Sequence, residues 1–296
     1  DFTAQPMAPY TPPMNALDDY RCFVVDPGWT ESHKLTTIRI TPGESRTVHH
    51  LNVFEIKAQA VPALMQVDAR DAAEGYRCFS GAGVPITSNG AIQVQFLAGW
   101  APGTPALRTP DNTALRVDPG SRVVLQVHYN QLGGRGLPDR SKVDLYFSDQ
   151  EARRIAMVVP LSANDFRIPA GAADHPVVAE ASPRTLGLPL NVTVYGEYAH
   201  MHGFGRSFHT EIVRADGTRE CLLDIPRWSF HWQQFYMLNE PVRVGADDRM
   251  RVECRYDNSA TNQPEINGVT RTPQEVREGT GTLDEMCVGF FYVTFF

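Results

Sequence analysis

The stretch SRVVLQVHYN, residues 121–130, decides the fold class. It is a short run rich in apolar and β-branched residues, which is typical of a β-strand with a buried face. Similar runs recur along the chain, among them RTVHHLNVFEI (46–56), NVTVYGEYAHMH (191–202) and MCVGFFYVTFF (286–296). Helical periodicity over ten or more residues is hard to find. The pattern predicts an all-β protein built from antiparallel sandwiches.

The segment that follows this stretch, NQLGGRGLPDRS (130–141), is polar and contains three glycines and one proline. It has nothing to bury, so we interpret it as a linker. The prediction is an N-terminal domain over residues 1–132 and a C-terminal domain over residues 141–296. A long hairpin loop inside one domain is the alternative.

The composition excludes several classes of protein. A formal net charge of −7 and the lack of a basic stripe argue against a nucleic-acid partner. A hydrophobic fraction of 42% is that of a folded globular chain. No continuous apolar run is long enough to cross a membrane, so no membrane span is predicted.

The five cysteines are widely spaced and form no CxxC pair, which argues against a zinc ribbon or a thioredoxin-like motif. Such spacing in a loop-rich β protein fits disulfides formed in an oxidising compartment, with at least one cysteine left over. The opening stretch DFTAQPMAPYTPPM (1–14) has no apolar signal core. We therefore expect a mature chain, exported to the periplasm or the cell exterior.

The histidine pattern indicates a metal site. His200 and His202 form a His-X-His in a strand-like run, and positions i and i+2 of a strand point to the same face. Two imidazoles so placed are a ready site for copper or zinc. Two solvent-facing histidines are the alternative.

Three further histidines are ambiguous when taken singly. His49 and His50 are adjacent and would point to opposite faces of a regular strand, so both can bind one metal only if the strand bends or bulges. His128 alone would most often be a buried core histidine. Gln126, its i+2 neighbour, is a candidate to hold the His128 imidazole by a hydrogen bond.

Four segments taken together in chain order resemble the copper type II, ascorbate-dependent monooxygenases: TVHHLNVF, LQVHYN, AHMHGFG and DEMCVGFFYV. The resemblance extends from about Tyr20 to Phe296. It implies an electron-storage copper bound by His49, His50 and His128. It implies a second, oxygen-binding copper bound by His200, His202 and Met286. Imidazoles suit a copper that changes oxidation state, and a thioether favours Cu(I).

The resemblance also implies a fold and a reaction. The fold is two antiparallel jelly-roll sandwiches that face each other across a cleft. The reaction is hydroxylation of a substrate C–H bond with O2, two copper ions, and ascorbate or another one-electron reductant. A disulfide between Cys254 and Cys287 would tether the strand that carries the methionine. Cys22 and Cys78 are a candidate second pair, and Cys221 has no evident partner.

Substrate recognition departs from one branch of the family. The peptide-amidating members bind a carboxylate through an arginine before the His-X-His and an asparagine and a tyrosine after the methionine. The corresponding residues here are Tyr198, Val288 and Phe290, so that clamp cannot form. We predict an apolar, aromatic-lined pocket for a small uncharged or aromatic substrate; the alternative is that these residues belong to the core. Glu197, Tyr195 and Asn258 are candidate polar contacts.

Two other functions are compatible with parts of this pattern. A non-catalytic copper protein that binds or carries the metal in the periplasm would need no substrate pocket. A zinc hydrolase built on the His-X-His is disfavoured, because these motifs contain no carboxylate base and a methionine suits zinc poorly. The sequence does not indicate the substrate's identity or the oligomeric state.

Overall fold

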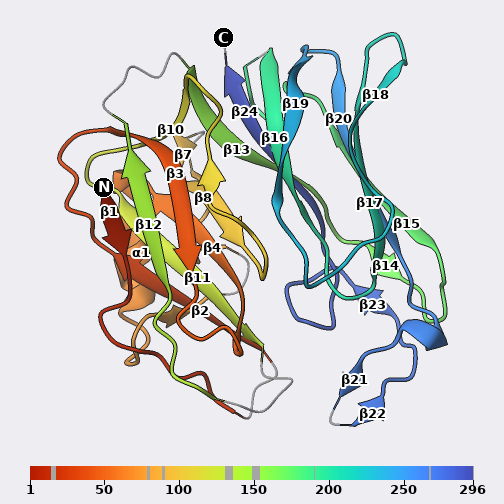
Figure 1. The fold of residues 1–296 in the computed structure, drawn as a ribbon, viewed down its shortest axis with the longest axis horizontal. Helices are drawn as coiled ribbons and strands as arrows, with labels where there is room; N and C mark the ends of the chain where they lie inside the picture. The colour runs from red at the N-terminus through yellow and green to blue at the C-terminus, as the bar shows by residue number, and fades with distance from the viewer. Residues whose placement is uncertain are drawn as a thin grey trace. The chain divides into compact units, whose positions relative to one another are not determined.

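The structure is a computed structural model that describes residues 1–14, 18–78, 81–88, 91–130, 136–148, 154–189, 191–266 and 268–295. Its regular elements are nearly all strands, and most of them pair antiparallel, which confirms the predicted all-β class (Figure 1). The jelly-roll connectivity stays a prediction. The chain divides into two compact units, Asp1–Val158 and Val159–Phe296. No helix in the described ranges is long and apolar enough to span a membrane.

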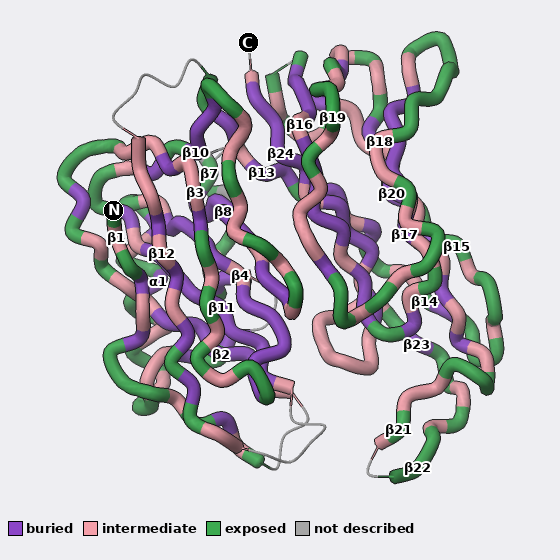
Figure 2. Tube along the Cα trace, in the orientation of Figure 1, coloured by how far each residue is buried: buried purple, intermediate pink, exposed green. Residues whose placement is uncertain are grey.

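Unit 1 contains a five-stranded sheet with the strand order β5-β2-β11-β4-β8. The bounds of these strands are Tyr76–Arg77 (β5), Asp18–Val25 (β2), Arg122–Asn130 (β11), Val48–Ile56 (β4) and Val94–Trp100 (β8). β11 pairs with β2 on one side and with β4 on the other, and every residue from Val123 to Tyr129 is buried (Figure 2). The stretch that predicted the fold is therefore the central strand of its sheet.

Unit 1 also contributes the consecutive strands β1-β12-β3-β10 to a second, nine-stranded sheet. These strands are β1 (Phe2–Ala4), β12 (Lys142–Phe147), β3 (His33–Thr41) and β10 (Thr113–Val117), with β9 (Leu107–Arg108) paired to β3. The remaining elements are η1 (Ala58–Ala60), α1 (Val61–Asp68), β6 (Thr87–Ser88) and β7 (Ala91–Ile92). Apolar side chains of both sheets are fully buried, for example Leu35 and Leu145 from this sheet and Val53 and Leu125 from the other, and they form the core of the unit.

The boundary between the units differs from the predicted one. The predicted linker 130–141, of which residues 131–135 lie outside the described part of the chain, follows β11 and leads into β12. β12 pairs with β1 and β3, and its Val143 and Leu145 are fully buried in unit 1. The division lies instead inside β13 (Arg154–Ala163). A polar, glycine-rich composition marks a loop between strands as well as one between domains, which explains the difference.

Unit 2 contains strands of two sheets that pack on each other. One has the order β13-β24-β16-β19 and the other β15-β20-β17-β18. The bounds are β24 (Cys287–Phe295), β16 (Val192–His200), β19 (Phe235–Val244), β15 (His175–Ala181), β20 (Arg249–Tyr256), β17 (Gly205–Val213) and β18 (Arg219–Ile225). The peripheral elements are β14 (Arg167–Ile168), η2 (Ala260–Asn262), β21 (Glu265–Ile266), β22 (Val269–Thr270) and β23 (Val276–Arg277). A Cβ placed on Gly289 of β24 would lie 3.0 Å from Val252 of β20, so the two sheets approach closely there.

Each unit contains one disulfide. Cys254 of β20 is bonded to Cys287 of β24, which confirms the predicted pair and joins the two sheets of unit 2. Cys22 and Cys78 form the second disulfide. Cys221 is an exposed free thiol on β18. Two disulfides in one chain indicate folding in an oxidising compartment.

Candidate copper centres

The three histidines of unit 1 lie together on two neighbouring strands. His50 on β4 is directly opposite His128 on β11. The register then shifts, because Tyr129 pairs with Val48, and His49 is left as the extra residue of a β-bulge. The bulge removes the strict alternation of side chains, which is the condition that the adjacent histidines required.

The ring nitrogens of these histidines converge. The Nδ1 atom of His50 lies 3.3 Å from Nδ1 of His49 and 3.3 Å from Nδ1 of His128, and one ligand atom from each ring falls within 4.8 Å of the others. Within the described ranges this is the one group of three or more His, Cys, Asp or Glu residues with such geometry. All three rings are largely buried. Three converging imidazoles fit a copper ion.

Asp18 holds the His128 ring in place. Its Oδ1 atom lies 2.8 Å from His128 Nε2, so Nε2 carries the hydrogen and the lone pair is on Nδ1, facing the other histidines. The Tyr20 ring stacks on the face of the His128 ring, with centroids 4.1 Å apart and planes 6° from parallel. Burial lowers the pKa of His128, and the Asp18 carboxylate opposes this shift. At neutral pH the ring is therefore a neutral ligand.

Gln126 does not hold His128 as we predicted from their i, i+2 spacing. Its amide donates to Gly81 O at 2.7 Å and accepts from Asn52 Nδ2 at 3.0 Å. Asn52 is its direct cross-strand partner on β4. Directly opposite residues of an antiparallel pair are closer than residues two apart on one strand, so the cross-strand contact prevails. Asp18 has the role that we assigned to Gln126.

In unit 2 the two histidines of the His-X-His lie where β16 ends. Nδ1 of His200 lies 2.8 Å from Gln233 Oε1, and Nδ1 of His202 lies 3.0 Å from the Asp284 carbonyl oxygen. Both partners are acceptors, so each Nδ1 carries the hydrogen and each Nε2 carries the lone pair. The ring centroids are 5.2 Å apart. Two imidazoles that are each oriented through Nδ1, with Nε2 as the nitrogen left to bind a metal, suit copper ligation.

Met286 lies directly before the first residue of β24. Val288 on β24 is opposite His200 on β16, and continuing the antiparallel register would set Met286 opposite His202. A hydrogen bond of 2.8 Å from His202 N to Glu285 Oε2 joins the two segments at that level. The chain thus brings a soft thioether to the end of the strand pair that carries the two imidazoles, a donor set that fits copper.

The three residues predicted to line a substrate pocket share the strand face that carries His200. Tyr198 is opposite Phe290, just as His200 is opposite Val288, and opposite residues of an antiparallel pair point to the same side. The rings of Tyr198 and Phe290 lie 6.0 Å apart, and Tyr198 is stacked beside His200 at 6.4 Å. Burial raises the pKa of the Tyr198 phenol, which stays protonated. Their role in substrate binding remains a prediction.

Two of the three candidate polar contacts, Glu197 and Asn258, lie elsewhere. Glu197 alternates with Tyr198 and faces the sandwich interior, where its carboxyl contacts the Thr210 hydroxyl of β17. Asn258 is fully buried and donates to the carbonyl oxygens of Pro169 and Gln274, which ties loops together.

A loop between β18 and β19 supplies contacts that sequence reasoning missed. Gln233 is buried and accepts a hydrogen bond from the His200 ring. The Phe230 ring centroid lies 6.0 Å from that of His202. The Trp228 indole N–H donates to the His202 carbonyl oxygen at 3.1 Å. No spacing rule links this loop to the His-X-His, because the contacts depend on tertiary structure. The aromatic content of RWSFHW was the one available signal.

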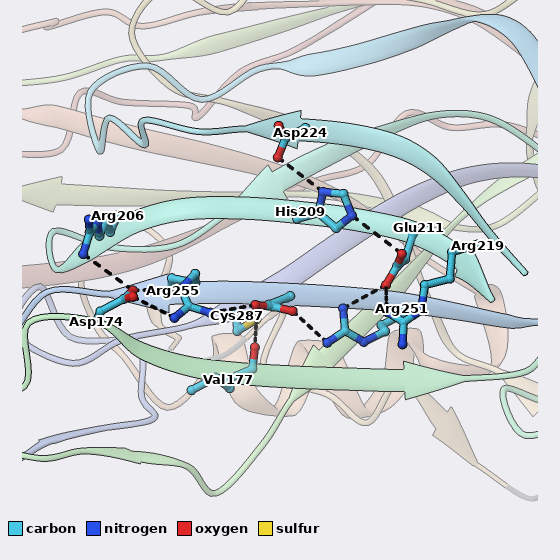
Figure 3. Close-up of polar contacts among 11 residues, drawn as sticks. Asp174, Val177, Arg206, His209, Glu211, Arg219, Asp224, Arg251, Arg255 and Cys287 are labelled. Carbon is cyan, nitrogen blue, oxygen red and sulfur yellow. Dashed lines mark hydrogen bonds and ion pairs between the residues drawn. The ribbon is translucent and has the colours of Figure 1, made fainter. Parts of the chain in front are cut away.

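The outer face of the other sheet of unit 2 is charged. Arg251 on β20 pairs with Glu211 on β17 at 3.0 Å, and Arg255 pairs with Asp174 at 2.7 Å (Figure 3). His209 lies on the same face, with its Nδ1 atom 3.3 Å from Asp224 Oδ1. The Arg251–Glu211 pair is largely buried, whereas Arg255 and Asp174 are partly exposed, and an exposed pair of this kind contributes little stability. The predicted copper ligands of unit 2 do not lie on this face but at the end of β16 and directly before β24.

The all-β units and the two donor sets define a candidate two-copper protein. Residues 155–296 match the family model for the copper type II ascorbate-dependent monooxygenase, C-terminal domain. Dopamine beta-hydroxylase of Bos taurus is 26% identical over 300 aligned residues, which cover 92% of this chain and 43% of that protein. Tyramine beta-hydroxylase of Caenorhabditis briggsae is 26% identical over 305 residues, which cover 95% of this chain and 46% of that protein.

Residues 155–296 thus match the C-terminal domain of the copper type II, ascorbate-dependent monooxygenases, and the chain as a whole is similar to the dopamine and tyramine beta-hydroxylases, in agreement with the family that the sequence motifs indicated. The chain spans less than half the length of these two relatives. Among solved structures, the glycosylasparaginase PNGase F of Flavobacterium meningosepticum matches 99% of this chain and 96% of that chain. Its identity of 12% and TM-score of 0.33 are too low to carry structural or functional information.

Proposed function

We propose that this protein is a copper-dependent monooxygenase that hydroxylates a C–H bond of a small uncharged or aromatic substrate, with O2 and ascorbate or a similar reductant. The observation that carries the proposal is the difference between the two donor sets. One is three imidazoles, and the other is two imidazoles beside a methionine. When bound, copper at these sites supplies the electrons and the O2 chemistry that insertion of one oxygen atom requires.

The side chains around each set orient the ligands. In unit 1, Asp18 and Tyr20 fix the His128 ring by a hydrogen bond and by stacking. In unit 2, Gln233 and the Asp284 carbonyl keep Nε2 of His200 and His202 as the ligating nitrogens. Rings held in one orientation lose little entropy on binding a metal, which favours both affinity and reactivity.

The aromatic face beside His200 is the proposed substrate site. Tyr198, Val288 and Phe290 provide an apolar wall, and the Tyr198 hydroxyl is a neutral hydrogen-bond donor. The relatives named for dopamine and tyramine support an aromatic substrate. We propose a phenyl or phenol ring carrying a short side chain, whose C–H bond is hydroxylated. The two disulfides support a periplasmic or extracellular location.

Product analysis tests this function. The copper-loaded protein is incubated with ascorbate, O2 and a panel of arylalkyl compounds, with tyramine, dopamine and uncharged analogues included. We expect ascorbate-dependent O2 uptake and a product with one added oxygen atom, and omission of copper is the control. Bound copper without any product or ascorbate consumption over the whole panel would favour the alternative of a non-catalytic copper protein.

A further inference from the structure

Glu285 joins the two segments that supply the ligands of the second centre. Its side chain is fully buried. Oε2 accepts a hydrogen bond from the main-chain N–H of His202 at 2.8 Å and another from that of Met286 at 3.2 Å. Oε1 accepts from the main-chain N–H of Phe204 at 2.6 Å. One oxygen atom therefore connects the main chains of a histidine and a methionine that are more than 80 positions apart in sequence.

A carboxylate is the side chain that this arrangement requires. The N–H groups of His202 and Phe204 lie beyond the end of β16, where the strand ladder no longer offers them carbonyl partners. A carboxylate presents two oxygens and no donor, so it accepts from all these groups at once. An amide in its place would direct an NH2 group at a main-chain N–H. No ion pair with a cation offsets the burial of Glu285 within the described residues, so the main-chain donors must compensate for its desolvation.

The main chain of Met286 is also held on its other side. The Tyr256 hydroxyl on β20 donates to the Met286 carbonyl oxygen at 2.8 Å. The next residue, Cys287, is tied to Cys254 of the same strand by the disulfide. The backbone of Met286 is thus attached to the His-X-His segment through its N–H and to the opposite sheet through its carbonyl. Its side chain remains half-buried.

We propose that Glu285 is a positioning residue that sets the distance between the Met286 thioether and the imidazoles of His200 and His202. The inference rests on the proposed function, since it takes Met286 to be a copper ligand. Without the Glu285 carboxylate, the hydrogen bonds that connect the main-chain N–H groups of His202 and Met286 through one oxygen atom are lost. The two imidazoles, which Gln233 and the Asp284 carbonyl orient, would still bind copper. The thioether would then bind weakly or not at all.

X-ray absorption at the copper edge tests the proposal, because in this donor set only Met286 supplies sulfur. In the Cu(I)-loaded wild type we expect a copper–sulfur scattering contribution. In E285Q we expect that contribution to be lost or weakened while two coppers per chain remain bound. Y256F removes one hydroxyl without removing the ring, and we expect a smaller loss. E275Q is the matched control, because Glu275 forms only exposed ion pairs with Arg167 and Arg277, and we expect it to retain the wild-type spectrum.

The possible outcomes distinguish the claim that Met286 is a copper ligand from the claim that Glu285 positions it. A wild-type spectrum with copper bound and no sulfur contribution would contradict Met286 as a ligand, and with it the proposed function. A normal copper–sulfur signal in folded E285Q would overturn the positioning role alone. If E285Q does not fold, Y256F decides: an unchanged copper–sulfur signal overturns the role of the backbone attachment, and a weakened one supports it.

Discussion

The two candidate copper centres are built in different ways. In unit 1 the ligands lie inside paired strands, where the register of β4 and β11 sets His50 against His128 and a bulge admits His49. In unit 2 the ligands lie at and beyond the ends of strands, and side chains from loops hold them. The first centre depends on the sheet, whereas the second depends on individual contacts such as those of Gln233 and Glu285.

The polar partners of the histidines also differ between the centres. His128 contacts the carboxylate of Asp18, whereas His200 and His202 contact an amide oxygen and a carbonyl oxygen. A carboxylate makes an imidazole a stronger donor and adds negative charge, which stabilises Cu(II). Neutral partners together with a thioether favour Cu(I). The two centres therefore present copper with environments of different electrostatic character.

The largest effect is expected from loss of the thioether. M286A should lower kcat roughly 100-fold or more, because a missing ligand removes about 3 kcal/mol or more of stabilisation from the reacting centre. Copper binding at His49, His50 and His128 should be unaffected. M237A, which removes a half-exposed methionine of β19, is the control and should behave as wild type. Turnover of M286A at the wild-type rate would contradict the claim that the second centre depends on a methionine ligand.

A smaller effect is expected at the carboxylate that orients His128. D18A should weaken copper binding at the tri-histidine centre roughly 10- to 100-fold, as is typical for loss of a partner to a ligating histidine. D18N keeps an acceptor oxygen without the charge, so its loss should be smaller. Competition with a chelator measures both. The control is D26N, since Asp26 forms an ion pair with Arg122 at the other end of β2 and β11. Equal copper affinity in D18A and D26N would contradict this role.

The last effect, and the smallest on catalysis, concerns the stability of the fold. Burial raises the pKa of Glu197 to about 8, so between its ordinary pKa and that value the folded state binds more protons than the unfolded state. The free energy of unfolding should therefore fall as the pH rises through this range, by at most about 1.4 kcal/mol for each pH unit. E197Q should be less sensitive to pH and should melt at a higher temperature than wild type at pH 8. Parallel pH profiles of the two proteins would show that Glu197 does not titrate in this range.

The residues that could be predicted from sequence are those whose role follows from local pattern. The run 121–130 and the similar runs along the chain specify strands through their composition and alternation. The His-X-His places two imidazoles on one face because alternate residues of a strand point to the same side. The cluster at His49 could be predicted only conditionally, because a bulge depends on the partner strand. Asp18, Gln233 and Glu285 could not be found, since each reaches its histidine across more than 30 positions of sequence. The polar segment 130–141 predicted a domain boundary, because turn composition does not encode which strand the next strand pairs with.

A crystal structure of the copper-loaded protein, with anomalous scattering measured at the copper edge, tests the central claim most directly. Two separate copper peaks are predicted. One should lie within bonding distance of nitrogens of His49, His50 and His128, and the other within bonding distance of His200, His202 and the Met286 sulfur. A map with one peak only, or with the Met286 sulfur turned away from a metal bound to His200 and His202, would contradict the assignment of two chemically different centres.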